Sequence, residues 1–356
     1  MSVSEEMRSF LQRIAVGPAG SKDLTKEEAY RAMGLCLDRE ASDIQIAVFL
    51  IAERLKRESD AEKAGFLEAI VDRAHIAVAH CDDIINLGDP YDGFKRIPHF
   101  GPLIAAVTGA CGRPTVVGGC SDMPPKHGLT HRRVLECYAG HALDTGHGEE
   151  SVKRAASRVA KSGCTYVDLA DFHPSLWALN TIRSEIAKRP ALSTLEKLIM
   201  PIRGRKNTHI VSGWVHTGFE TQLTEILRQC DVKSVLLFRG REGHIDAFSH
   251  RATSLYGYRN SGLNVNQELV PASLGIDASP APDWNDVTPE SVCELWEQIL
   301  DGVEGPGRTC TALSAAAILV HSGCFQSMET AYSRSLEALS SGAAKASFKV
   351  MLEPSI

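Results

Sequence analysis

The sequence predicts an α/β protein, in which a small all-helical N-terminal domain precedes a larger domain with a mainly parallel central sheet and C-terminal helices. Two patterns predict this architecture. Helix-start signals recur in the N-terminal segment, and from about residue 84 short β-branched runs alternate with helical stretches. A chain of 356 residues with 44% hydrophobic content is long enough for two domains. We therefore expect domains over 1–80 and 81–356, with part of 175–200 packing against the first.

The helices of the first domain are expected to begin at three signals of one kind, a hydroxyl residue followed three positions later by Glu or Gln. In such a box the first side chain caps a free backbone N–H, and the second reaches back to the N–H of the cap. The boxes are Thr25 with Glu28, Ser42 with Gln45, and Ser59 with Glu62. Apolar side chains then recur at helical spacing, at Ile44, Ala47, Val48, Ile51 and Leu55 and at Leu67, Ile70, Val71 and Ala74. These faces exceed what a small bundle can bury, which predicts a homodimer joined through this domain.

In the second domain, β-branched runs and helical stretches follow one another along the chain. The runs are 84–87, 115–117, 166–169, 209–212 and 234–238, and the helical stretches are 102–111, 130–138, 175–187 and 217–229. Such alternation gives a mainly parallel sheet covered by helices. Ligands of these sheets bind beyond the carboxyl ends of the strands. The segments after Leu87, Val117, Leu169 and Phe238 are therefore expected on one rim.

The C-terminal part is expected to be helical after a loop over 260–288, which is rich in Pro, Asn and Ser. Thr288 and Pro289 supply an N-cap and a proline at the first helical position. The helical periodicity of the segment that follows predicts which of its residues are buried. They are Leu295, Ile299, Leu313, Ala316, Ala317 and Val320.

Composition excludes several classes of protein. Apolar stretches such as 44–51 and 312–320 are shorter than the about 20 residues of a membrane-spanning helix, and the start MSVSEEMRSF lacks the basic and then apolar pattern of a leader. The ten cysteines are scattered singly, as is typical of reduced, buried thiols. A net charge of −6 argues against a chain built mainly to bind nucleic acid. We expect a cytoplasmic protein without membrane contact.

A cationic loop follows the run 115–117 on the predicted rim. It carries Lys126, His127, Arg132 and Arg133 after a stiff Pro124-Pro125 pair. If these side chains converge, they suit a single phosphate or carboxylate, because Arg offers a bidentate fork and Lys a point charge. The sequence thus predicts a small anionic ligand, with a solvated loop as the alternative.

Three segments resemble the anthranilate phosphoribosyltransferase family. DLTKEEAYRAMGLCLDREASDIQIAVFLIAERLK is similar to its N-terminal helical domain, SAAAILVHSGCFQSMETAYSRSLEALSSGAAKASF to its last helices, and DFHPSLWALNTIRSEIAKRPALSTLEKLIMPI to its acceptor segments. Together the pieces span most of the chain. The resemblance implies a dimer and transfer of a ribosyl or phosphoribosyl group to a nitrogen acceptor.

The resemblance breaks at the family's G-T-G-G-D loop, whose bare backbone amides hold phosphoribosyl pyrophosphate. Gly88, Asp92 and Gly93 match substrate-binding positions, but Pro90 removes an amide donor and Tyr91 adds bulk. The family's next phosphate-binding motif, N-x-S-T, falls on Pro98, Phe100 and Gly101. We expect weak binding of that donor, which puts the family's standard activity in doubt.

Other family positions give the remaining candidates. Lys126, His127 and Gly128 match K-H-G, and the resemblance implies that Lys126, Arg132 and Arg133 stabilise departing phosphate. It places magnesium at Glu242 and Asp246, although Ile245 replaces one family carboxylate, and ordinary loop acids are the alternative. On the acceptor side the matches are His173, Arg183 and Arg189.

Two hypotheses in which the protein is not an enzyme stay open. One is a nucleic-acid binder, with Arg203, Arg205 and Lys206 as one basic surface and Lys153, Arg154, Arg158 and Lys161 as another. The second group recurs at helical spacing, as on a solvated helix face, and the aromatic residues of single-strand binding platforms are missing. The other is a dimeric regulator that keeps the fold. The sequence favours a small-molecule, transferase-like protein over both.

Overall fold

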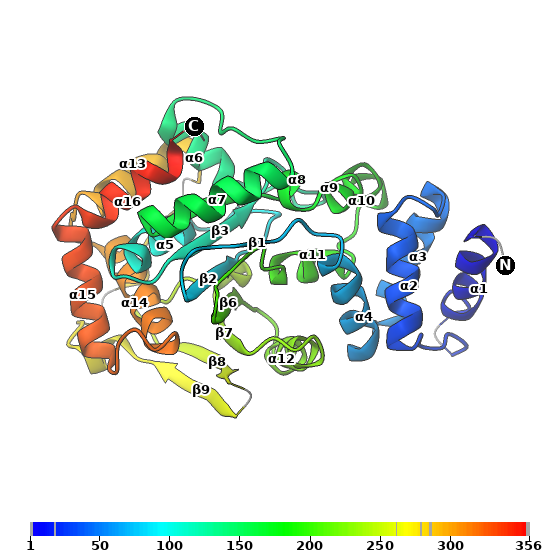
Figure 1. The fold of residues 1–356 in the computed structure, drawn as a ribbon. Helices are drawn as coiled ribbons and strands as arrows, with labels where there is room; N and C mark the ends of the chain where they lie inside the picture. The colour runs from blue at the N-terminus through cyan, green and yellow to red at the C-terminus, as the bar shows by residue number, and fades with distance from the viewer. Residues whose placement is uncertain (1–2, 18, 261, 278–279, 285–286, 354–356) are drawn as a thin grey trace.

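The computed structural model describes residues 3–17, 19–260, 262–277, 280–284 and 287–353 (Figure 1). Four N-terminal helices lie at one end of the molecule, the sheet lies in the middle, and the last four helices lie at the opposite end (Figure 1). The predicted fold class is confirmed. Each of the ten cysteines is a free thiol. Among the described residues, no helix is both long and apolar enough to cross a bilayer.

The N-terminal helices begin where the sequence predicts. They are α1 (Val3–Ile14), α2 (Lys26–Leu37), α3 (Asp43–Lys56) and α4 (Asp60–Val71). All three capping boxes are present, because Thr25, Ser42 and Ser59 each accept the N–H three residues later and the Glu or Gln there accepts the N–H of the cap. Local hydrogen bonds therefore set these helix starts.

One side of α3 is apolar and faces outward. Ile46, Phe49 and Leu50 are buried, whereas Ile44 is 77% and Leu55 is 76% exposed. Val48 lies between them on the same stripe, half-exposed. The stripe that the sequence marks as apolar is thus left uncovered by the chain's own helices.

The central sheet has seven strands in the order β4-β3-β2-β6-β7-β8-β9. The parallel strands are β2 (Asp83–Gly88), β3 (Thr115–Gly119), β4 (Cys164–Asp168), β6 (Asn207–Gly213) and β7 (Ser234–Phe238). Leu87 pairs with Val117 on one side and Val211 on the other, so these strands end at a common edge. We call this carboxyl edge, with the segments that follow its strands, the rim. A separate parallel pair joins β1 (Ala77–Val78) to β5 (Ile202–Arg203).

The prediction of a loop over 260–288 is wrong for the first part of that range. β8 (Thr253–Arg259) and β9 (Leu263–Leu269) form an antiparallel hairpin on β7, and a short 3₁₀ helix covers Pro271–Leu274. β9 is an edge strand with polar residues on its open face, and its pairing with β8 overrides a poor strand propensity. Asn260 adopts a positive φ at the turn. Residues 261, 278–279 and 285–286 lie outside the described part.

Helices cover both faces of the sheet. The helices between strands are α5 (Gly101–Ala110), α6 (His131–Ala139), α7 (Glu149–Ser162) and α12 (Phe219–Gln229). The stretch predicted as one helix over 175–187 is broken into α9 (Pro174–Trp177) and α10 (Asn180–Ile186), preceded by α8 (Leu169–Phe172) and followed by α11 (Leu192–Leu195) and a 3₁₀ turn over Glu196–Leu198. α10 packs on α3, and α11 and α12 pack on α4.

The C-terminal helices are α13 (Pro289–Leu300), α14 (Pro306–His321), α15 (Met328–Ser340) and α16 (Ala343–Leu352). Thr288 caps α13 as predicted. Ile299, Leu313, Ala316 and Ala317 are buried, whereas Leu295 and Val320 are only partly so. α5 lies under α14 and α16, which explains why nearly every residue of α5 is apolar.

Candidate functional site

The side chain of Tyr91 fills the space inside the loop after β2. Tyr91 is buried, and a Cβ placed on Gly118 at the end of β3 would lie 2.3 Å from the Tyr91 hydroxyl oxygen. The tyrosine ring therefore occupies the space next to the strand end, in edge contact with Phe172. Gly88 is needed for a different close approach, because a Cβ placed there would lie 2.0 Å from the Lys197 carbonyl oxygen.

Gly93 and Gly128 hold two loops together. The Gly128 N–H donates to the Asp92 carbonyl at 2.9 Å, and Phe94 and Leu129 exchange backbone hydrogen bonds. A Cβ on either glycine would lie within 2.7 Å of the other loop's backbone. The two glycines thus allow the two loops to pack closely, and Gly93 also has a positive φ.

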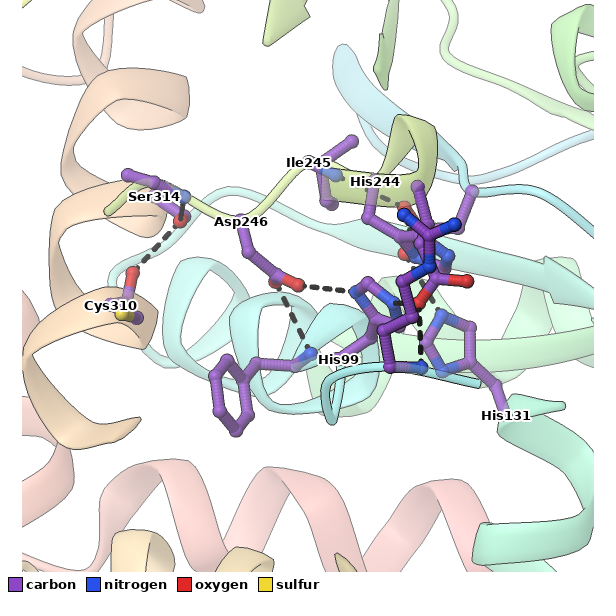
Figure 2. A network of polar contacts seen from close by, with 12 residues as sticks. His99, His131, His244, Ile245, Asp246, Cys310 and Ser314 are labelled. Carbon is purple, nitrogen blue, oxygen red and sulfur yellow. Dashed lines mark hydrogen bonds and ion pairs between the residues drawn. The ribbon is translucent and has the colours of Figure 1, made fainter. Parts of the chain in front are cut away.

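A histidine–carboxylate cluster, consisting of Asp89, His99, His131, His244 and Asp246, lies buried where the segments after β2, β3 and β7 meet (Figure 2). The sequence does not predict this cluster, because the members of the cluster are up to about 150 positions apart and belong to no spaced motif. Their only common signal is a place in segments predicted for the rim. Ser314 of α14 accepts the Ala247 N–H at 2.7 Å and so fixes the segment that carries His244 and Asp246.

Hydrogen bonds tie parts of this cluster together. His131 Nε2 lies 2.9 Å from Asp89 Oδ2, and the Ile245 N–H donates to Asp89 Oδ1 at 3.2 Å. His99 Nδ1 lies 2.7 Å from Asp246 Oδ2. Burial alone would raise the pKa of Asp89, but the adjacent His244 and His131 hold it well below its usual value. At Asp246, burial outweighs the contact with His99 and the hydrogen bond from the Phe100 N–H, and raises the pKa.

Glu242 and Asp246, the predicted metal ligands, are separated by the ring of His99. Its Nδ1 faces Asp246 at 2.7 Å and its Nε2 faces Glu242 at 3.7 Å. Glu242 also pairs with Lys126 at 2.8 Å and accepts the N–H groups of Lys95 and Arg96. These donors and the His99 contact overcome the opposing effect of burial and lower the pKa of Glu242. The assignment of both carboxylates to magnesium stays a prediction.

The rim cations do not converge, so that expectation is wrong. Lys126 bonds the Gly93 carbonyl and Glu242, and His127 pairs with Asp122 on the surface. Arg132 pairs with Asp168 at 2.9 Å and Glu136 at 2.8 Å, while Arg133 is exposed on α6. Each of the three paired side chains contacts a carboxylate on a different segment, so the three cations do not share a site.

The acceptor-side candidates lie in three different environments. His173 is buried, with Nε2 2.8 Å from the Ile70 carbonyl, and links the two domains. Arg183 is fully buried, and its terminal nitrogens donate to Glu196 and Ser193. Arg189 is 49% exposed at its side chain and pairs with Asp92 at 2.6 Å. Of the three, Arg189 is the one that a ligand can reach.

A cleft of about 840 Å³ lies between the helical domain and the rim. One wall carries Arg54, Arg57 and Lys63, and the segment 187–194 adds Lys188 and Arg189. The rim side carries Pro90, Asp92, Pro125, Gly213, Trp214, Val215, Glu242 and Gly243. The cleft therefore combines cations on one side with apolar side chains and two carboxylates on the other.

Lys197 lies buried at the edge of this cleft and is a candidate that the sequence interpretation missed. Its Nζ donates to the Gly213 carbonyl at 2.5 Å. Burial lowers the pKa of Lys197 to about 8, partly opposed by the attraction of Asp89, Asp92 and Glu196. From the sequence alone, Lys197 cannot be distinguished from a surface lysine. Only the tertiary structure shows that it is buried.

The fold and this cleft define a class of two-domain α/β proteins, whose ligand cleft lies between a helical bundle and the rim of a parallel sheet. The chain belongs to the glycosyl transferase family. The model of the family's helical bundle domain matches residues 8–74, and that of its a/b domain matches residues 134–345. Neither match includes 75–133, which carries Asp89, His99 and His131.

Curated relatives include an anthranilate phosphoribosyltransferase of Thermomicrobium roseum, 27% identical over 344 residues that cover 94% of this chain and 93% of the relative. An uncharacterized protein of Aquifex aeolicus is 26% identical over 300 residues, which cover 84% of this chain and 88% of the relative. The name of the first relative agrees with the predicted family.

Solved structures share the fold over nearly the whole chain. Anthranilate phosphoribosyltransferase from Thermus thermophilus superposes with a TM-score of 0.79 at 19% identity, covering 99% of this chain and 98% of that one. The enzyme of Saccharomyces cerevisiae, in complex with PRPP (phosphoribosyl pyrophosphate) and Mg, has a TM-score of 0.79 at 12% identity and the same coverage.

Proposed function

We propose that this chain is an anthranilate phosphoribosyltransferase-like protein that binds a small phosphate- or carboxylate-bearing ligand in the interdomain cleft and transfers a ribosyl or phosphoribosyl group to a nitrogen acceptor. One observation carries the proposal. Within the described part of the chain, the cleft residues Arg57 and Lys188 have no ionic partner, whereas Arg189 beside them is only half-buried. Free cations beside apolar side chains such as Trp214 and Val215 suit a small anion with an organic part.

Transfer of this kind develops positive charge on the sugar and negative charge on the departing anion, so positioning and electrostatics provide the catalysis and no protein nucleophile is required. We assign the anion to Arg57, Lys188 and Arg189. Of the residues predicted as catalytic, Lys126 adjoins the cleft through Glu242. Arg132 and Arg133 lie on α6, outside the cleft lining, and have no role in this proposal.

Phosphoribosyl pyrophosphate with magnesium is expected to bind weakly. Pro90 lacks a backbone N–H, the buried Tyr91 ring fills the space beside Gly118, and Asp89 places a carboxylate near the start of α5, where phosphate would need amides. Magnesium stays a predicted cofactor, but Glu242 and Asp246 face Lys126 and His99 instead of each other. No step of the proposal passes through it. Tight, magnesium-dependent binding in calorimetry would contradict this expectation.

We also infer a homodimer through the helical domain. A groove of about 600 Å³ runs along the outward stripe of α3 and is lined almost entirely by apolar residues, among them Ile14, Val48, Leu55 and Ile186. Sedimentation should give a dimer at micromolar concentration, and Val48→Asp should give a monomer because it buries a charge in the interface. Val303→Asp, at an exposed apolar site on another surface, is the control. A wild-type monomer would refute the inference.

A melting screen tests the ligand class. Phosphoribosyl pyrophosphate, phosphate, nucleosides, aromatic acids and oligonucleotides are added in turn, since saturating ligand adds a few kcal/mol of stability at about 100-fold its dissociation constant. A shift with a small anion supports the proposal. A shift with oligonucleotides alone would replace it by nucleic-acid binding, although Arg205 and Lys206 already pair with Asp82. The cytoplasmic location stays a prediction.

A further inference from the structure

The histidine–carboxylate cluster contains an imidazole whose hydrogen-bonding capacity is not used. His244 is 1% exposed; among the described residues its Nε2 has no hydrogen-bonding partner, and its Nδ1 lies 3.3 Å from Asp89 Oδ1 without forming a hydrogen bond. Nε2 of His99 and Nδ1 of His131 are buried in the same condition. Buried polar atoms without partners are uncommon and call for a ligand or ordered water. Of these four nitrogens, two belong to His244, which also lies beside Asp89 and His131, so His244 is the imidazole available to a further ligand.

The surrounding charges select a cation. Asp89, Asp246 and Glu242 supply three carboxylates, and among the described residues Lys126 is the one ammonium group that pairs with any of them. Asp89 also lies against the start of α5, because a Cβ on Gly101 would be 2.5 Å from Asp89 Oδ2. A phosphate there would meet this carboxylate instead of free amides. An anionic ligand is therefore disfavoured inside the cluster.

We propose that Asp89, His131 and His244 bind a divalent transition metal of the zinc class. Ligand atoms about 2.0–2.1 Å from a tetrahedral zinc lie about 3.3 Å from one another. His131 Nε2 is 2.9 Å from Asp89 Oδ2, and His244 Nδ1 is 3.3 Å from Asp89 Oδ1, so each imidazole stands at about this separation from one oxygen of the Asp89 carboxylate. All three donor atoms lie within 4.8 Å of one another.

The donor set determines which metals fit. Two imidazoles and one carboxylate suit zinc, iron, cobalt or nickel, whereas magnesium prefers an all-oxygen octahedron with several waters. Three protein ligands also leave a position open, as in metal centres that bind water or substrate.

A second group, His99, His244 and Asp246, shares His244. It is less suitable, because the His99 ring stacks on the His244 ring with centroids 3.1 Å apart (Figure 2). We assign the His99–Asp246 pair to positioning of the His244 ring. Outer-shell partners of this kind commonly orient metal-bound imidazoles.

Metal analysis of the full-length chain tests the proposal independently of turnover. The protein is stripped with a chelator, dialysed and titrated with Zn²⁺ and, separately, Co²⁺. We expect one metal per chain, visible d–d absorption bands with Co²⁺, a higher melting temperature with Zn²⁺, and no competition from Mg²⁺. A wild-type chain that takes up neither metal, with an unchanged melting temperature, would show that water fills the cluster and would overturn the proposal.

Variants test the ligand set. His131→Gln and His244→Gln should each weaken Zn²⁺ binding by more than the roughly 10–100-fold that loss of an outer-shell partner brings. His209→Gln is the matched control, since His209 is equally buried but bonds Ser234 far from the cluster. Should either cluster variant fold poorly, the wild-type Co²⁺ spectrum still decides whether a metal binds. Wild-type Zn²⁺ affinity in a folded His244→Gln protein would exclude this site.

Discussion

The rim and the interdomain cleft adjoin one another, but their charges are satisfied in opposite ways. Around the rim, Lys126, Arg132 and Asp246 are largely buried, and each has a partner of opposite charge. In the cleft, Arg57 and Lys188 are exposed and, as far as the chain is described, have no ionic partner. A closed set of pairs supports structure, whereas free cations beside an open cavity can bind a ligand.

This difference changes which residues are functional candidates. Family resemblance directs attention to the strand ends, where phosphate would sit, but here Tyr91 and the histidine–carboxylate cluster fill that region. The cleft wall contributed by the helical domain keeps its open cations. Ligand binding therefore moves towards the helical domain, and the predictions below test that shift.

Arg183→Ala should have the largest effect, a loss of about 3–5 kcal/mol in the free energy of unfolding, because it leaves Glu196 buried and uncompensated. The measurement is denaturant unfolding at neutral pH. The control is the double substitution Arg183→Met with Glu196→Met, which should recover most of that loss. If Arg183→Ala keeps wild-type stability but loses ligand, Arg183 belongs to the binding site after all.

Lys197→Met should stabilise the protein at pH 7 by about 2 kcal/mol, since a lysine whose pKa falls from 10.5 to about 8 disfavours folding while charged. Between pH 8 and 10.5 the unfolded chain binds more protons than the folded one. Wild-type stability therefore rises with pH in that window, and the difference from the variant shrinks.

Urea unfolding at pH 7 to 10 measures this effect. Lys206→Met is the control, because Lys206 is exposed and pairs with Asp82. A constant difference between wild type and Lys197→Met across the range would show that Lys197 is not the titrating group.

Arg132→Ala and Arg133→Ala compare adjacent residues of α6. Arg132 is partly exposed but pairs with the buried Asp168, so its loss should cost about 2 kcal/mol. Arg133 is exposed and its replacement should stay within about 0.5 kcal/mol. Thermal unfolding of both variants measures the difference. Equal stability combined with loss of anion binding in both would restore the rim as the binding site.

Arg57→Gln with Lys188→Gln should have the smallest effect on stability and a selective effect on binding. Neither side chain has an ionic partner in the described residues, so the melting temperature should change little. Affinity for the small anion found in the melting screen should fall by about 1.5–3 kcal/mol in calorimetry. Unchanged affinity would move the ligand out of the cleft.

Sequence alone determined the elements that depend on neighbours along the chain. The helix starts at Thr25, Ser42 and Ser59 follow from hydrogen bonds that span three residues, and alternating runs fixed a parallel sheet with its rim. Replacement of the donor loop by Pro90 and Tyr91 was equally visible. The β8–β9 hairpin was missed, because β9 has weak strand propensity and depends on pairing with β8, which in turn pairs with β7.

Only the tertiary structure decided the partner of each charge. Lys126 meets Glu242, Arg132 meets Asp168 and Arg189 meets Asp92, across separations in sequence that no periodicity reports. The histidine–carboxylate cluster arises in the same way, from three loops brought to one edge of the sheet. Coulombic attraction and desolvation depend on distance and burial in space, and a sequence pattern specifies neither between remote segments.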